Sequence, residues 1–236
     1  MLNSVAVDEQ VDAQPLVVAV SGGNDQVFVA TENNTVYRID AVTGTILQSR
    51  NLGLPVPMSS LPGSCNNNSA VVGITSTPVI DVGTQTLYVM TYTMESGSQV
   101  YRIHALDLET LADKIGSGVI VAGSGVLSNS TTYTFNPVVS RQRSALLEAN
   151  GNVYAGFASF CDFAASSSRG WMLGWDATTL TPLAANVLVD KQESSKDNYF
   201  LSSIWMSGAG PAVDENGNLF SLLATLIQVE RLTTRC

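Results

Sequence analysis

The sequence is poor in charge: Asp, Glu, Lys and Arg make up 13% of its 236 residues. There are 11 basic residues and 20 acidic ones, which gives a net charge of −9. Because binding to a phosphate backbone needs a basic surface, we expect no nucleic-acid partner. No apolar run reaches the ~20 residues of a membrane-spanning helix. The first residues lack the basic and apolar regions of a signal peptide, so neither kind of segment is expected here.

Histidine and cysteine are also scarce. The chain has one histidine, His104, and three cysteines, Cys65, Cys161 and Cys236. The cysteines lack the C-x-x-C spacing of zinc and thioredoxin-like sites, so we expect no metal centre. A serine hydrolase would need a base that is oriented by a third group. His104 falls on a predicted strand, and we interpret it as a packed strand residue rather than a base.

What the sequence does contain is a repeat of short strands. Helical periodicity is nearly absent, and the apolar segments are short, β-branched or aromatic, and bounded by Gly, Asn, Asp and Pro. An aromatic residue recurs at Phe28, Tyr88, Tyr154 and Phe220, at spacings of about 60 to 66 residues. A period of this length made of strands predicts the blades of a β-propeller with enlarged loops.

Turn residues follow the same repeat. Asp40, Asp107 and Asp176 each end a predicted strand, where their carboxylates would accept hydrogen bonds from backbone N–H groups of the next turn. We interpret these residues as structural rather than catalytic. Asn150-Gly151 and Asn216-Gly217 predict hairpins. The second motif is not interpreted as a calcium loop, because its glycine stands at the wrong position and the distal glutamate is absent.

We therefore predict an all-β fold, a β-propeller of four-stranded antiparallel blades with about three and a half blades in the chain. The propeller covers residues 14–224, and residues 225–236 form a divergent tail outside the repeat. The long connections, between blades and between the second and third strands, are expected on one face, where loops carry function. The predicted blades span residues 14–53, 73–115, 143–188 and 208–224.

Candidate ligand-binding residues gather on this long-loop face. Arginine and tryptophan suit a polar or saccharide-like ligand, through planar hydrogen bonding and stacking. In the alternative interpretation, the tryptophans seal the interfaces between blades and the arginines satisfy loop carbonyls. No catalytic residue and no metal ligand is proposed. The candidates are Arg141, Arg143, Asp162, Trp171 and Trp205.

Cys65 and Cys161 both lie in loops of this face. In an oxidising compartment they could pair across a loop of nearly a hundred residues, which would stabilise the fold by up to about 4–5 kcal/mol. Because a whole blade intervenes, the pairing requires the two Cα atoms to approach within ~7 Å. The disulfide between them is therefore a hypothesis that holds only if the fold brings the two Cα atoms within this distance.

Several segments resemble the PQQ-like propeller blade, and more narrowly a group of bacterial, often secreted, PQQ-binding-like β-propeller repeat proteins. The resemblance covers about residues 14 to 224 and implies a quinoprotein alcohol dehydrogenase-like fold and an extracellular or periplasmic location. Where the group has histidines this chain has Phe160 and Arg169, so no acid–base role transfers to these positions. The segments that carry the resemblance are 27–37, 73–81, 158–162, 170–171 and 204–211.

The resemblance does not fix a reaction. Quinoprotein dehydrogenases bind PQQ beside a calcium ion with a stacked tryptophan and two adjacent cysteines, and this chain has no adjacent cysteines. We therefore expect no cofactor and a non-enzymatic extracellular or envelope propeller that binds a ligand or protein partner on its long-loop face. The alternatives are a fragment of a PQQ-dependent oxidoreductase and an envelope assembly scaffold. Because the fourth predicted blade has two strands only, self-association through open blade edges is also expected.

Overall fold

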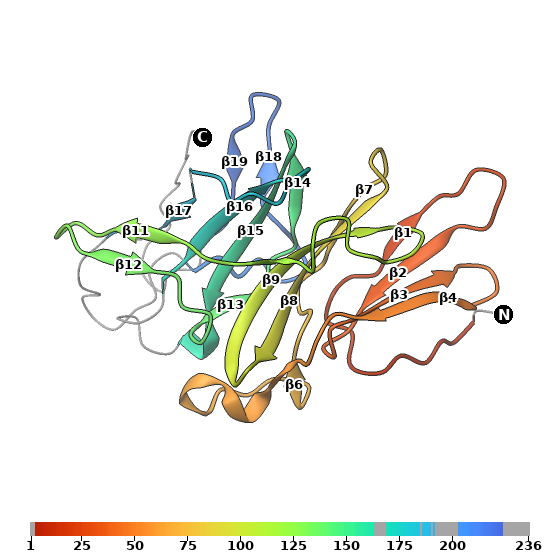
Figure 1. Cartoon of the computed structure of the whole chain (residues 1–236), viewed down its shortest axis with the longest axis horizontal. Coiled ribbons are helices and arrows are strands. Elements are labelled where there is room, and N and C mark those ends of the chain that lie inside the picture. Colours follow the sequence, from red (N-terminus) through yellow and green to blue (C-terminus); the bar gives the residue numbers. More distant parts are fainter. Residues whose placement is uncertain (1–2, 163–168, 185, 190, 192–202, 224–236) are drawn as a thin grey trace.

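The computed structural model describes residues 3–162, 169–184, 186–189, 191 and 203–223. Its strands form consecutive antiparallel sheets that lie side by side (Figure 1). We call the sheets blades one to four, in chain order. Blade one contains β1 (Leu16–Val18), β2 (Gln26–Ala30), β3 (Thr35–Asp40) and β4 (Ile46–Asn51). Blade two contains β7 (Val79–Asp81), β8 (Thr86–Glu95), β9 (Ser98–Asp107) and β10 (Val119–Ile120).

Blades three and four follow the same meander. In blade three the inner strand is divided into β13 and β14, which both pair with β15. Blade four is described as one hairpin. The strands of blade three are β13 (Ser140–Gln142), β14 (Leu147–Ala149), β15 (Asn152–Ser159), β16 (Trp171–Asp176) and β17 (Val187–Leu188). Those of blade four are β18 (Ala212–Val213) and β19 (Leu219–Phe220).

Small elements lie in the connections between blades. Between blades one and two, β5 (Val56–Pro57) pairs with β6 (Val71–Val72), and two 3-10 helices lie between these strands: η1 (Met58–Ser60) and η2 (Pro62–Ser64). Between blades two and three, β11 (Ser124–Val126) pairs with β12 (Thr132–Thr134). A third 3-10 helix, η3 (Phe160–Asp162), follows β15. Within the described residues no helix is long and apolar enough to cross a membrane.

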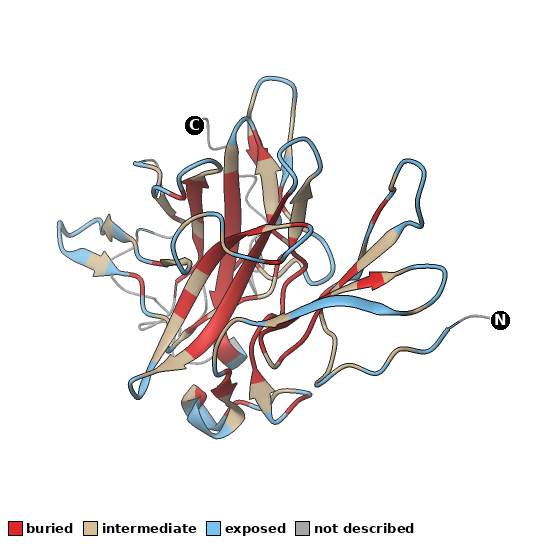
Figure 2. Ribbon diagram, turned by 45° about the vertical axis from the view of Figure 1, so that its right-hand side comes forward, coloured by how far each residue is buried: buried red, intermediate tan, exposed pale blue. Residues whose placement is uncertain are grey.

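The blades pack face to face because their strands are apolar on both sides. Successive residues of a strand point to opposite faces. In β8, Leu87 and Val89 pack against blade one, whereas Tyr88, Met90 and Tyr92 pack against blade three. The result is two extended layers of buried side chains between three sheets, which Figure 2 shows as buried strands in the middle of the molecule.

The inner ends of the blades are joined by hydrogen bonds around a common axis. The Gln14 N–H donates to Thr77 Oγ1 (3.0 Å), the Leu146 N–H donates to the Thr77 carbonyl (3.0 Å), and the Ala145 N–H donates to the Ala209 carbonyl (2.8 Å). These bonds connect blades one, two, three and four in sequence. Because each blade begins at this axis and the last strand of blades one, two and three lies outermost, the fold is a β-propeller.

The predicted aspartate turns are confirmed. Asp107 Oδ1 accepts hydrogen bonds from the N–H groups of Glu109 (3.1 Å) and Thr110 (2.9 Å), and Asp40 and Asp176 bind their turns in the same way. The turn hydrogen bonds lower the pKa of Asp107 and Asp176, and at Asp40 the amide of Asn24 is the largest cause of the lowering, followed by the turn N–H groups. The hairpin at 214–218 is confirmed as well, because Asp214 Oδ1 accepts from the N–H groups of Asn216 and Asn218.

The two ends of the blades differ, and the prediction that one end carries the long connections is correct in part. We call one end the turn face; it carries the short turns at 19–25, 82–85, 108–112, 150–151 and 177–180. The other end, the loop face, carries the segment 52–78, the segment before β13, and η3. The expectation that second and third strands are joined by long loops was too general, because the turns at 31–34 and 96–97 are tight. In blade two the strands themselves are long, since apolar alternation continues almost to the turn.

Candidate functional site

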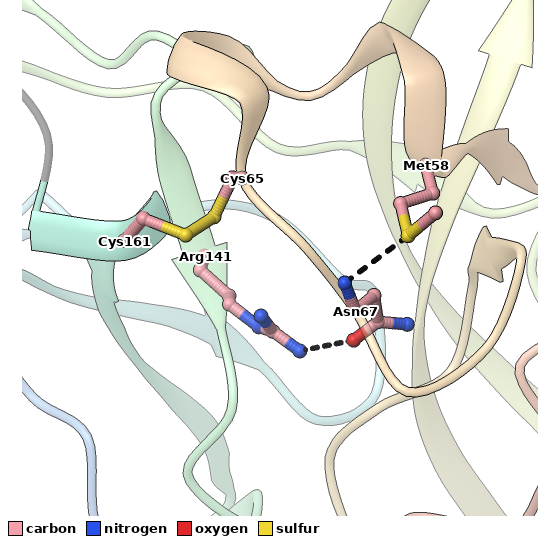
Figure 3. Close-up of a disulfide and its surroundings, with 5 residues drawn as sticks. All are labelled: Met58, Cys65, Asn67, Arg141 and Cys161. Carbon is pink, nitrogen blue, oxygen red and sulfur yellow. Dashed lines mark hydrogen bonds between the residues drawn. A yellow bond between two sulfur atoms is a disulfide. The ribbon is translucent and has the colours of Figure 1, made fainter.

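Arg141 lies on β13, at the loop-face end of blade three. Its Nη2 atom donates a hydrogen bond to Asn67 Oδ1 (2.8 Å), as Figure 3 shows. Its Cζ atom lies 5.4 Å from the centre of the Phe160 ring. Asn67 belongs to the segment between β5 and β6. The arginine is therefore oriented by an amide from the neighbouring loop and by the face of an aromatic ring.

A disulfide fixes the loop that carries Asn67. Cys65 and Cys161 are bonded, with their Cα atoms 5.7 Å apart and 96 residues apart in sequence, so the geometric condition set by the sequence is met (Figure 3). The Asn67 N–H donates to Met58 Sδ (3.3 Å), and Asn67 Nδ2 donates to the Val71 carbonyl (2.9 Å). These contacts hold the loop against η3 of blade three, one side of the candidate site.

Arg143 lies just beyond β13, where the inner strand of blade three is interrupted. Its Nη1 atom donates to the Thr75 carbonyl (3.0 Å), in the segment that leads into blade two. The adjacent Ser144 forms a bridge with Ser207 of the segment that enters blade four. Arg143 thus lies at the junction of blades two, three and four, near the axis of the propeller.

Trp205 is the second predicted residue at this junction. It is half-buried, and it follows Ile204, whose N–H donates to the Phe157 carbonyl (3.2 Å). The side chain of Ile204 lies against Gly156, where an added Cβ would come within 2.5 Å of it. These contacts place Trp205 beside the interrupted inner strand, close to Arg143 in the chain path.

The structure corrects the interpretation of Trp171 as a ligand-binding residue. Trp171 is fully buried on β16, between the stacked ring of Tyr133 (5.9 Å between centroids) and the edge of Phe135 (6.1 Å). It belongs to the core between blades two and three, so it seals an interface, as the alternative interpretation proposed. The side chain of Asp162 lies outside the described part of the structure.

Sequence reasoning missed a buried carboxyl group between blades one and two. Glu32 is 0% exposed; its Oε2 atom accepts hydrogen bonds from the Gly73 N–H (2.7 Å) and Thr75 Oγ1 (3.2 Å). Its Oε1 atom has no hydrogen-bond partner among the described residues. Burial raises the pKa of Glu32 to about 7 despite the hydrogen bond from Gly73, and the neighbouring carboxyl of Asp12 adds to the rise.

Gly73 is required by this arrangement. A Cβ atom at position 73 would lie 2.3 Å from the Glu32 carbonyl oxygen and 2.8 Å from Asn34 Oδ1. Nothing in the sequence marks Glu32 as buried, because it stands in a polar turn. A glycine six residues before the β7 strand is the only local signal, and it does not identify the residue that packs against it.

One buried set of residues has the hydrogen-bonding order of a catalytic triad: a hydroxyl, a histidine and a carboxylate. His104 Nδ1 lies 2.8 Å from Asp113 Oδ1, and His104 Nε2 lies 3.3 Å from Thr91 Oγ1. Asp113 also forms an ion pair with Arg50. Although burial opposes the change, the hydrogen bond from His104 and the charges of His104 and Arg50 lower the pKa of Asp113. Because Thr91 is 0% and His104 3% exposed, no substrate can reach them, which agrees with a packed strand histidine.

The sequence matches no protein-family model and no curated protein. The fold is similar to solved structures. The computationally designed Ika4 protein has a TM-score of 0.46 and 11% identity, over 98% of both chains. BamB from Moraxella catarrhalis has a TM-score of 0.42 and 18% identity, over 90% of this chain and 51% of BamB.

A quinohemoprotein alcohol dehydrogenase from Comamonas testosteroni has a TM-score of 0.44 and 15% identity, over 88% of this chain and 33% of the enzyme. The chain thus spans about half the length of BamB and a third of the length of the dehydrogenase.

Proposed function

We propose that the protein is a non-enzymatic β-propeller, of the secreted PQQ-binding-like type, that binds a polar ligand or a protein partner on its loop face. The observation that supports this proposal is the disulfide between Cys65 and Cys161, which fixes the segment carrying Asn67 against blade three beside Arg141. A surface that is ordered before binding loses less conformational entropy when a ligand arrives. Among the described residues, the turn face carries short turns, most of which are bound to an aspartate of their own.

An extracellular or periplasmic location goes with this proposal, because structural disulfides persist in oxidising compartments. A quinoprotein oxidoreductase is the second candidate, since quinoprotein dehydrogenases share the propeller fold. We favour the binding role because the chain has no adjacent cysteines for PQQ. A saturable change in PQQ absorbance at micromolar cofactor, with calcium supplied, would reverse this preference.

The proposal is tested by comparing the two faces. Val138, just before β13 on the loop face, is 41% exposed, and Val82, in a turn of the turn face, is 54% exposed. The variants Val138→Glu and Val82→Glu therefore add the same charge and bulk to opposite ends of the molecule. Neutral and acidic saccharides and short peptides are screened by thermal shift. We expect the shift caused by a ligand to disappear in Val138→Glu and to persist in Val82→Glu; the reverse pattern, or no ligand at all, would refute the proposal.

A further inference from the structure

Two arginines at the start of blade three are oriented by neutral groups alone. Arg141 contacts the amide of Asn67 and the ring of Phe160, and Arg143 contacts the carbonyl of Thr75. Within the described part of the chain, neither arginine forms an ion pair. Neither arginine is therefore paired with a described carboxylate, in a protein whose net charge is −9.

Other arginines of the propeller are arranged differently. Arg50 is paired with Asp113, and Arg102 is paired with Glu95 at 2.7 Å. Arg38 has neutral partners, the side chain of Gln26 and a backbone carbonyl, but it stands alone on β3 of blade one. The distinguishing feature of Arg141 and Arg143 is that they form a pair.

The pair is directed to one side of the inner strand. Although β13 ends at Gln142, burial alternates along the chain from Ser140 to Ser144 with Arg141 and Arg143 the less buried residues, as expected where alternate side chains point to the same side. Their contacts agree, since Asn67 and Thr75 both belong to the segment that leads into blade two. Arg141 Nη1 and the Nε and Nη2 atoms of Arg143 form no hydrogen bond in the described structure. These donors are available to a common acceptor.

We propose that Arg141 and Arg143 together bind the carboxylate of a ligand, and that this ligand is a uronic acid residue. The inference rests on the proposed function and names the ligand class of the loop face. A planar guanidinium matches the two oxygens of a carboxylate, and hydrogen bonds between charged groups are the stronger kind. Trp205, half-buried at the same junction, provides the aromatic side chain against which a sugar ring packs.

The surroundings favour a monoanion over a phosphate dianion. Thr75 accepts the hydrogen bond from Arg143 through its carbonyl and donates its hydroxyl to Glu32. An acidic group is therefore connected to Arg143 through a single residue, Thr75, and the net charge of the protein is negative. Each additional negative charge on the ligand would be repelled by both.

The test is isothermal titration of the full chain with D-galacturonate, D-galactose and inorganic phosphate. The variants are Arg141→Gln and Arg143→Gln, and Arg38→Gln is the control that removes one positive charge far from the pair. Arg143→Lys keeps the charge but not the planar fork. We expect saturable binding of galacturonate, and at least about tenfold weaker binding of galactose and phosphate. Either glutamine variant should weaken galacturonate binding at least about tenfold, the change expected for a lost charge-assisted hydrogen bond, and Arg38→Gln should change it less than about twofold.

The outcomes separate this inference from the proposed function. Absence of galacturonate binding, equal binding of galactose, tighter binding of phosphate, or indifference to Arg141→Gln and Arg143→Gln would each overturn the carboxylate assignment. If a ligand from the Val138 and Val82 comparison still binds the glutamine variants with unchanged affinity, the loop face binds by other residues and only the carboxylate assignment fails. If no ligand depends on Val138, the proposed function fails too.

Discussion

Glu32 makes the contact between blades one and two sensitive to pH. Its carboxyl is fully buried, and burial raises its pKa from 4.5 to about 7. The folded protein therefore holds the proton more tightly than the unfolded chain does. The stabilisation is complete below pH ~4.5 and is lost as the pH rises through 7. At about 1.4 kcal/mol for each pKa unit, the loss is about 3 kcal/mol, an upper value for a carboxyl that interacts with a second one.

The variant Glu32→Gln should remove this dependence. The glutamine side chain keeps an oxygen for the Gly73 N–H, and its amide can donate toward Asp12 without a charge. We expect the free energy of unfolding of the native protein to fall by up to about 3 kcal/mol between pH 5 and pH 8.5. Over the same range the variant should change much less and should be the more stable protein at pH 8.5.

The measurement is guanidinium chloride unfolding, followed by tryptophan fluorescence at several pH values in this range. The range is chosen because the pKa values of Asp40 and Glu95 are lowered to about 2, so their contributions are lost only in more acidic solution. Glu109→Gln, at an exposed position in a turn, is the matched control. If Glu32→Gln and Glu109→Gln follow the native pH dependence equally, Glu32 is not the group responsible and the reasoning is wrong.

Two further substitutions test the loop face and the packing of blade two. Replacing both Cys65 and Cys161 with alanine should lower the free energy of unfolding by about 4 to 5 kcal/mol, the chain-entropy value for a 96-residue loop. A reductant should destabilise the native protein by a similar amount and should leave the variant unchanged. An unchanged denaturation midpoint in the variant would contradict this prediction. Gly118→Ala should lower the melting temperature more than Gly97→Ala does. Both glycines have φ near +80, but only at position 118 would the new Cβ lie 2.5 Å from the ring of His104. An equal decrease in the two variants would mean that the ring moves freely.

The blades could be predicted because their signals are local. Asp107 and the N–H groups that it binds lie within three residues of one another, and the same spacing recurs at Asp40 and Asp176. Such a turn forms largely independently of the rest of the chain, so a sequence pattern identifies it. The tight turn of blade two was not predicted, although its signal is local as well. Ser96-Gly97 stands between two alternating apolar segments, and Gly97 has the positive φ that such a turn requires.

The contacts between blades could not be read in this way. The candidates Arg141 and Arg143 were found by their place at the start of an inner strand, yet the partners that orient them are 74 and 68 residues earlier. The tryptophans show the limit more sharply. Trp171 and Trp205 were equivalent candidates from the sequence, but the first is enclosed by Tyr133 and Phe135 from the preceding connection. A repeat tells which positions of different blades correspond, and not which side chains meet across an interface.

Glu32 is the residue for which a contact between blades, rather than the local repeat, has the largest physical effect. Turn positions such as 32 are ordinarily solvated, and a glutamate there is ordinarily ionised. It becomes buried only because the segment after β6 passes over the turn closely enough that residue 73 must be glycine. The same segment then carries Thr75, which binds Glu32 with its hydroxyl and Arg143 with its carbonyl. One strand entry thus joins three blades through polar contacts, and the charges on either side of it are set by tertiary packing rather than by the repeat.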